Sequence, residues 1–181
     1  MKRFSLQEIP AQPWKNGGGT TRELALSECQ GQTRWRISLA DINQDGAFSS
    51  FPGLARIHCI VEGAGLVLSN STVKLAARPL DPLVFSGDLA LSAQLNEGAC
   101  RAFNLIYDPA FCQAEMRVLH PKAGFGGHGE SVIFLLMGEL AVQTGAGELR
   151  LRAGDGLVTK DLSPGHIPEG ALVIETLLSE P

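Results

Sequence analysis

Polar and charged side chains recur along strand-like segments of the first hundred residues, where they could bind a small anion. Arg36 and Arg56 each fall within such a segment, and an arginine fork inside a small barrel suits a carboxylate, which it binds with paired hydrogen bonds. The arginines could instead be surface charges, or Arg36 could pair with Glu23 or Asp88 in the barrel wall. The predicted ligand-binding residues are Asn16, Thr21, Arg22, Arg36, Ser38, Ser49, Arg56, Glu62 and Asn104.

Catalysis is the alternative role for these side chains. Acid–base chemistry needs titratable groups with displaced pKa values, and Glu62 and Asp88 are the candidate bases, although the sequence does not show that they face each other. Ser38 and Ser49 lack an evident histidine base, since His58 is the only histidine in that half. Binding is therefore favoured over catalysis, and the alternative is a metal-independent isomerase or hydrolase with a carboxylate base.

The histidines and cysteines lack the spacing of a metal site. His58 and Glu62 could supply two ligands, but a third and a fourth are missing, and no two of the four histidines form an H-x-H pair. The four cysteines contain no C-x-x-C pair and are expected to be free thiols. We expect no metal and no other cofactor.

The elements that position these side chains are predicted to be strands. Apolar and polar residues alternate over 20–26 and 34–40, and Gly, Pro and Asp separate further apolar runs at the spacing of all-β folds. No segment has a helical period for ten residues, and only 108–113 could form a helical turn; 41–51 is expected to be a loop. Further strands are expected within 4–12 and at 56–61, 66–68, 73–75, 83–85, 89–95 and 101–107.

The second half of the chain repeats landmarks of the first half. Gly63 corresponds to Gly138, Asp81 to Asp155 and Gly98 to Gly170, with separations of 75, 74 and 72 positions. Strand, glycine turn, strand and acidic turn in this order are typical of a small jelly-roll barrel of the cupin class. The sequence therefore predicts an all-β bicupin, with one barrel in residues 1–108 and the other in 109–181, packed as one unit.

A glycine-rich stretch, residues 13–23, precedes the first long predicted strand. It lacks the Lys-Ser/Thr helix start of a phosphate-binding loop. Three consecutive glycines at 17–19 permit a close backbone approach. We predict that this stretch crosses near the mouth of the first barrel and brings Asn16, Thr21, Arg22 and Glu23 to its rim.

Composition and net charge limit the classes of molecule that the protein is expected to bind. The chain has 181 residues, of which 44% are hydrophobic and 19% charged, enough for a large core. A net charge of −4 with scattered basic residues disfavours nucleic acid, and no apolar run reaches the length of a membrane helix. The first residues lack the apolar segment of a signal peptide. We expect a cytoplasmic protein that binds a small anionic metabolite; the apolar run 132–137 is expected to be core, with a homodimer interface as the other option.

Five blocks of the first 105 residues resemble those of the HutD/Ves family, in order. They are 13–23, 35–40, 45–53 followed by Arg56 and Glu62-Gly63, 85–88, and 103–105. The resemblance implies a bicupin without the usual cupin metal set. It also implies binding of a histidine-pathway intermediate, such as a formylated or formimino glutamate, and modulation of histidine utilisation. Ala47 and Ala102 depart from the family pattern, where proline and aspartate are common.

Overall fold

The computed structural model describes residues 1–127 and 129–181, and strands, turns and bends make up this part of the chain. None of these residues forms a helix long and apolar enough to cross a membrane. Contacts divide the chain into two units, Ile9–Ala110 and Met1–Glu8 with Phe111–Pro181. We call these the first barrel and the second barrel. The all-β prediction is confirmed.

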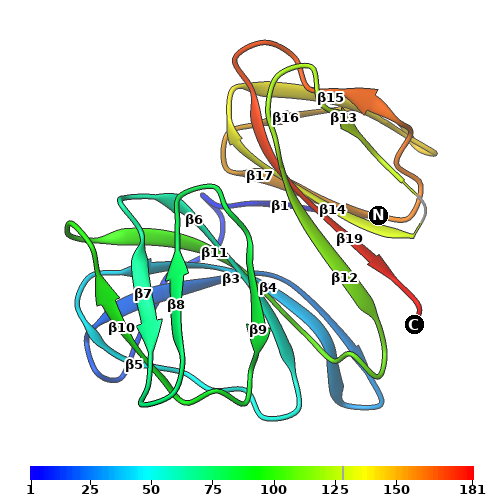
Figure 1. The fold of residues 1–181 in the computed structure, drawn as a ribbon. Coiled ribbons are helices and arrows are strands. Elements are labelled where there is room, and N and C mark those ends of the chain that lie inside the picture. Colours follow the sequence, from blue (N-terminus) through cyan, green and yellow to red (C-terminus); the bar gives the residue numbers. More distant parts are fainter. Residues whose placement is uncertain (128) are drawn as a thin grey trace. The chain divides into compact units, whose positions relative to one another are not determined.

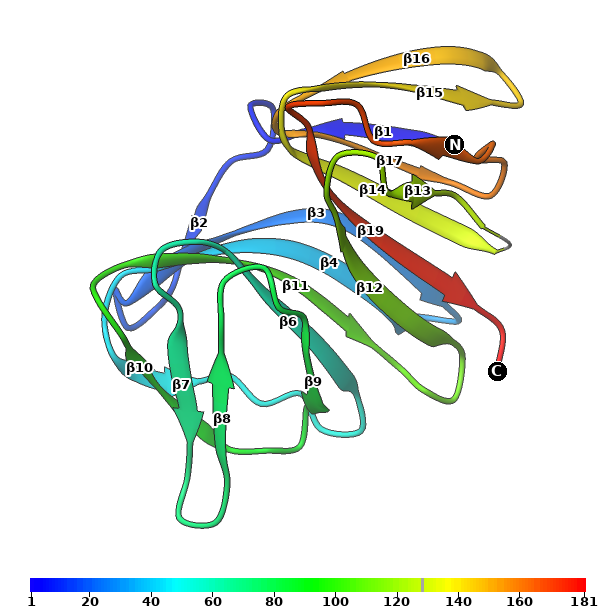
Figure 2. The ribbon, with the colours of Figure 1, turned by 45° about the horizontal axis from the view of Figure 1, so that its top comes forward.

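The first barrel consists of a six-stranded and a four-stranded antiparallel sheet (Figures 1 and 2). Buried aliphatic side chains such as Ile42, Ile60 and Leu66 form its hydrophobic core. The six-stranded sheet has the order β2 (Gln12–Pro13), β3 (Gly19–Cys29), β4 (Gln32–Ile42), β11 (Cys100–Tyr107), β6 (Ala55–Glu62) and β9 (Leu83–Ser86). The four-stranded sheet has the order β5 (Gly46–Phe48), β10 (Leu91–Leu95), β7 (Leu66–Ser69) and β8 (Lys74–Ala77).

The second barrel has a five-stranded sheet and two two-stranded sheets around a separate aliphatic core. The sheet has the order β1 (Lys2–Ser5), β17 (Asp155–Thr159), β14 (Glu130–Met137), β19 (Leu172–Ser179) and β12 (Gln113–Leu119). The paired short strands are β13 (Gly124–Phe125) with β18 (Gly165–His166), and β15 (Glu139–Thr144) with β16 (Gly147–Arg152). Within the run 132–137, Val132 to Leu135 are buried, whereas Met137 is 55% exposed.

The internal repeat predicted from the landmarks is visible in backbone geometry. Gly63 and Gly138 follow β6 and β14 with φ of 90° and 83°. A Cβ on either would lie 2.9 Å from the Cα of the matching residue, Cys100 or Ala171. The amides of Leu80 and Gly154 likewise donate to the carbonyls of Ile60 and Leu135, both at 2.8 Å. The two barrels are therefore built on one backbone pattern.

Three local expectations differ from the structure. Residues 46–48 lie within the expected loop but form β5, because they pair with β10 across a long separation in sequence. Residues 108–113 form no helix. The N-terminal segment forms two short strands, and the first of them belongs to the second barrel because Phe4 in β1 pairs with Gly156 in β17. A strand pattern reports that a segment is extended, but not which distant strand it joins.

Candidate functional site

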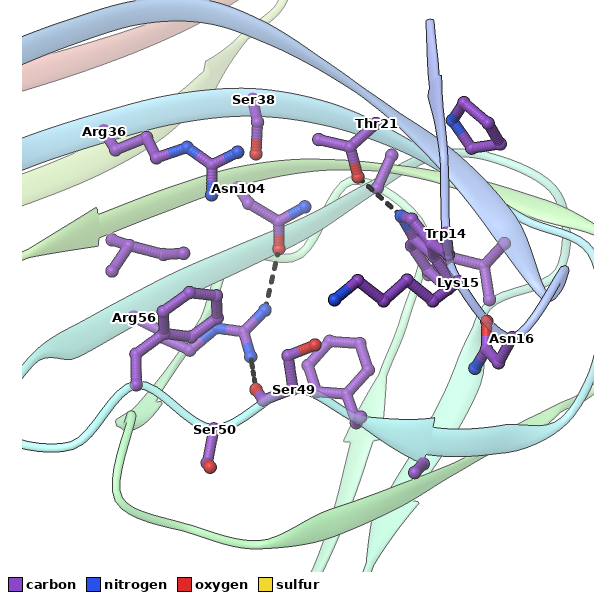
Figure 3. A pocket seen from close by; sticks show the side chains of 17 residues that line it. Trp14, Lys15, Asn16, Thr21, Arg36, Ser38, Ser49, Ser50, Arg56 and Asn104 are labelled. Atoms are coloured by element: carbon purple, nitrogen blue, oxygen red, sulfur yellow. Dashed lines mark hydrogen bonds between the residues drawn. The ribbon is translucent and has the colours of Figure 1, made fainter.

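A cavity of about 690 Å³ opens in the first barrel, and it gathers most of the predicted ligand-binding residues (Figure 3). The walls come from β3, β4, β6 and β11, from the segment around β5, and from the β2–β3 hairpin. None of the described residues that line it is an aspartate or a glutamate. The predicted residues that line the cavity are Asn16, Thr21, Arg36, Ser38, Ser49, Arg56 and Asn104.

Strand register brings these residues into two adjacent rows. Ser38 on β4 pairs with Asn104 on β11, which pairs with His58 on β6. Two positions along, Arg36 and Arg56 flank Ile106 in the same way. Because residues two apart on a strand share a face, the rows line one side of the sheet.

Arg56 is a buried guanidinium with neutral partners. Its side chain is 5% exposed. Nη1 donates to the Ser49 carbonyl at 2.8 Å and Nη2 to Asn104 Oδ1 at 3.3 Å, while Nε has no partner among the described residues. The guanidinium carbon lies 4.3 Å from the centre of the Phe48 ring, a cation–π distance. Burial, reinforced by the nearby Arg36 charge, lowers the pKa of Arg56 to about 10, so that it stays charged at neutral pH.

Arg36 has a carboxylate partner, as the alternative interpretation of the sequence expected. Its Nε donates to Glu23 Oε2 at 2.7 Å, and the Glu23 side chain is 44% exposed. None of the salt bridges among the described residues involves Arg56. The uncompensated charge at this end of the cavity is therefore that of Arg56.

His58 fixes the orientation of Asn104 beneath the cavity. It is fully buried, and its Nδ1 lies 2.7 Å from Asn104 Oδ1. That oxygen also accepts from Arg56, and an amide oxygen only accepts, so Nδ1 carries the proton and donates. Burial lowers the pKa of His58 to about 4, although the Asn104 hydrogen bond opposes the shift. The imidazole is therefore neutral at pH 7.

The depressed pKa of His58 predicts acid sensitivity. The unfolded chain takes up a proton near pH 6.5, whereas the folded protein resists it until about pH 4. Because the unfolded state binds more protons in this window, the free energy of unfolding should fall by up to about 3 kcal/mol as pH drops through it. Urea unfolding at several pH values tests this. The His58→Leu variant should lose this part of the slope, and the exposed-site control His120→Gln should retain it.

The glycine-rich stretch forms the β2–β3 hairpin at the rim of the cavity. Trp14 Nε1 donates to Thr21 Oγ1 at 2.7 Å, and the Gly18 amide donates to Asn16 Oδ1 at 3.0 Å. A Cβ on Gly19 would lie 2.1 Å from the Asp41 carbonyl oxygen and 3.1 Å from the Trp14 ring. The glycines thus allow close packing on β4, while Trp14, Lys15 and Asn16 line the cavity.

Three of the predicted site residues lie outside the cavity. They are Arg22, Asp88, which is a candidate base, and Glu62, which is predicted both to bind the ligand and to act as a base. Arg22 donates to Asp41 at 3.1 Å, on the face of β3 opposite to Thr21. Glu62 is 64% exposed and pairs with Arg101 at 2.8 Å. Asp88 is exposed and accepts from the Gly53 amide at 2.8 Å, the main cause of its lowered pKa. The structure thus places Arg22 and Glu62 in an ion-pair network around Asp41, and Asp88 at a turn, away from this cavity.

The lining residues that were not predicted from the sequence include Trp14, Lys15, Phe48 and Phe51. Trp14 and Lys15 directly precede Asn16, and the two phenylalanines bracket Ser49 in an expected loop. The hydrogen-bonding groups of their neighbours are evident in the sequence, whereas the stacking of Phe48 and Phe51 on the Arg56 guanidinium depends on the fold. A serine flanked by aromatics in the segment before Arg56 was the available signal.

Comparison with known proteins assigns the family. Residues 6–170 match the profile of the HutD family. The chain belongs to the HutD family. A Pseudomonas putida relative, an uncharacterized 21.2 kDa protein in the hutC 3' region, is 40% identical over 114 residues, which are 61% of this chain and 60% of that protein. Protein Ves of Escherichia fergusonii is 33% identical over 142 residues, 76% of this chain and 74% of Ves.

Solved structures support the same assignment. HutD from Pseudomonas fluorescens SBW25, in a formate condition, superposes with a TM-score of 0.83 at 29% identity, covering 99% of this chain and 98% of that chain. A Bacillus subtilis oxalate decarboxylase mutant superposes with a TM-score of 0.69 at 10% identity, covering 99% of this chain and 77% of that chain. The second likeness shows the cupin-type bicupin fold alone.

His58 and Glu62, the two possible metal ligands in the sequence, are not arranged to bind a cation in this HutD-family barrel. His58 Nδ1 is occupied by Asn104, and the Arg56 charge nearby would repel a metal ion. Glu62, the second candidate ligand, is held at the surface by Arg101. Residues 1–127 and 129–181 contain no group of three His, Cys, Asp or Glu side chains arranged as ligands; His128 lies outside the described residues.

The second barrel carries an internal ion pair at the position equivalent to Asn104. Because Cys100 corresponds to Ala171, Glu175 is the counterpart of Asn104. Asn104 pairs with Ser38 on β4, and Glu175 pairs in the same way with Arg117 on β12. Glu175 is fully buried, forms a salt bridge to Arg117 Nη2, and accepts from the Gly126 amide at 2.6 Å. The second barrel thus neutralises its own buried charge, whereas Arg56 in the first barrel has no counter-ion among residues 1–127 and 129–181.

Proposed function

We propose that the first barrel reversibly binds a small carboxylate metabolite, such as a formylated glutamate, and that the protein thereby modulates histidine utilisation in the cytoplasm. The observation that carries this proposal is Arg56, a 5% exposed guanidinium that forms no salt bridge with the described residues and opens onto the cavity. A buried charge without a partner is costly. A bound carboxylate would supply the missing charge and accept from the free N–H groups of Arg56.

The cavity suits such a ligand in size and charge. Its volume of about 690 Å³ lies within the range of small-molecule sites. Its charged lining residues are Lys15, Arg36 and Arg56, all cationic. A cleft lined by one sign of charge concentrates ligands of the opposite sign.

The same lining favours binding over catalysis. Neither Glu62 nor Asp88 lines the cavity, and the one histidine beneath it holds its Nδ1 proton toward Asn104. Ser38 and Ser49 line the cavity, but none of the hydrogen bonds described joins their hydroxyls to a base that could activate them. An isomerase or hydrolase would need a proton acceptor facing the ligand.

The link to histidine utilisation comes from the relatives. The family is named HutD, and the Pseudomonas putida relative is named for the region 3' of hutC. We extend that context to this chain as part of the proposal.

Titration calorimetry with formylglutamate, urocanate and glutamate tests the proposal. We expect formylglutamate to bind at one site per chain, and Arg56→Met to weaken it at least about tenfold, because hydrogen bonds to charged groups contribute roughly 1.5–3 kcal/mol. Arg101→Met removes an arginine of the surface network and should bind normally. Absence of heat with every carboxylate, or unchanged affinity in Arg56→Met, would refute the proposal. Product formation, followed by NMR, would instead support the enzymatic alternative.

A further inference from the structure

The cavity has a second cationic end, and its side chain comes from the glycine-rich hairpin. We propose that Lys15 determines specificity by binding a second anionic group, so that the ligand is a short-chain dianion rather than a monocarboxylate. This inference rests on the proposed function, because it concerns the same cavity.

At the first end, the two arginines supply little more than one uncompensated charge. Arg36 and Arg56 occupy one row across the sheet, separated by Ile106. Arg36 is already paired with Glu23 at 2.7 Å. A single carboxylate at this end is therefore sufficient to compensate Arg56.

At the other end, Lys15 reaches inward. Figure 3 shows the Lys15 side chain entering from the side opposite to Arg36 and Arg56. Its ammonium group points into the cavity, toward the arginines. Lys15 takes part in none of the salt bridges among the described residues. The lining therefore presents Lys15 as a further positive charge beside Arg56, and none of the described lining residues is a carboxylate that could neutralise it.

The hairpin holds the backbone of Lys15 at this position. The Trp14 amide donates to the Gly19 carbonyl at 2.9 Å, and the Gly17 amide donates to the Trp14 carbonyl at 3.0 Å. The Trp14 ring is held by its bond to Thr21, and Gly19 packs on the Asp41 carbonyl with no room for a side chain. The backbone on both sides of Lys15 is thus fixed, while its four-carbon stem can adjust to an anion. This explains why a run of glycines precedes the first long strand.

Neutral groups near the arginines and the Lys15 ammonium define the middle of the ligand. Ser38 and Asn104 lie near the arginine end, and Ser49 lies near the Lys15 ammonium group (Figure 3). These hydroxyl and amide groups suit a polar spacer rather than a bare hydrocarbon. The ligand class is accordingly a dicarboxylate whose acid groups are separated by a short polar chain.

Two pairs of compounds that are matched in shape but differ in charge test the inference. N-formylglutamate and N-formylglutamine have nearly the same shape and differ by one charge, as do glutarate and its monoamide. We expect the wild-type protein to bind each diacid about tenfold more tightly than its monoamide, which corresponds to about 1.4 kcal/mol. Lys15→Met should reduce this ratio to about one and leave the affinity for the monoamides within about twofold.

The control variants separate this inference from the proposed function. Lys74→Met removes an exposed lysine of β8, which does not line the cavity, and should keep the preference for the diacids. Arg56→Met should weaken both members of each pair. Equal binding of diacid and monoamide by the wild type, or a preference that survives in Lys15→Met, overturns the role of Lys15 alone. Failure of all four compounds to bind overturns the proposed function and this inference together.

Discussion

Asn104→Asp should weaken carboxylate binding strongly while the first barrel stays folded. The substitution keeps the shape of the side chain and places a carboxylate where Oδ1 now accepts from Arg56 at 3.3 Å and from His58 at 2.7 Å. Arg56 would then have an internal counter-ion, and an incoming anion would also meet a negative charge. We expect affinity to fall about a hundredfold, or roughly 2.7 kcal/mol, in calorimetry with formylglutamate.

The control for this substitution is the same chemical change outside the cavity. Asn96→Asp alters an exposed asparagine whose Nδ2 donates to the Ala64 carbonyl. It should bind formylglutamate as the wild type does. Circular dichroism and thermal unfolding would show that Asn104→Asp remains folded, because its carboxylate is paired and hydrogen-bonded. Wild-type affinity in a folded Asn104→Asp protein would show that Arg56 is not the anion-binding group.

Alternation along strands predicted the fold better than it predicted the site. It predicted the long strands and the two repeated barrels, because the alternation of side chains along a strand and the glycines at turns can be recognised within a short segment of sequence. Applied strictly, the same rule separates Thr21 from Arg22, since neighbours on a strand face opposite sides. Thr21 lines the cavity and Arg22 joins the Asp41 network, so only one of these adjacent residues could belong to the site.

The rest of the site depends on strand register, which is not a local property. Asn104 meets His58 and Arg56 because β11 lies between β4 and β6, at separations of 46 and 48 residues. The sequence favours a structural His58 over a metal ligand, but it does not show that Nδ1 of His58 donates to Asn104. In the same way, Glu62 ends its strand at the surface because a register shift precedes it in the pairing with β11.

In the second barrel, the position equivalent to Asn104 carries a charged side chain, and the counter-ion comes from the same barrel. Glu175 replaces Asn104 in the equivalent register and is matched by Arg117, so this barrel needs no external ion to balance its buried group. The contrast supports a single anion site per chain. It also makes the Arg117–Glu175 pair a test of how strongly a buried carboxylate depends on its partner.

Arg117→Met should destabilise the second barrel by roughly 3–5 kcal/mol, because it leaves a fully buried carboxylate without its cation. The Gly126 amide would remain as a donor to Glu175, but one neutral hydrogen bond does not replace a charge. Urea unfolding followed by far-UV circular dichroism, which reports the strands of both barrels, would measure the loss. Tryptophan fluorescence adds a separate report on the first barrel, because Trp14 and Trp35 both lie in it.

Two further variants identify the cause of that loss. Arg117→Met combined with Glu175→Gln removes both charges and should recover most of the stability, since breaking a buried pair costs far more than replacing it. Arg150→Met removes an arginine that is 82% exposed and pairs with Glu148, and it should change stability by less than about 1 kcal/mol. If Arg117→Met behaved like Arg150→Met, the Glu175 carboxylate would not depend on Arg117, and the contrast drawn between the two barrels would fail.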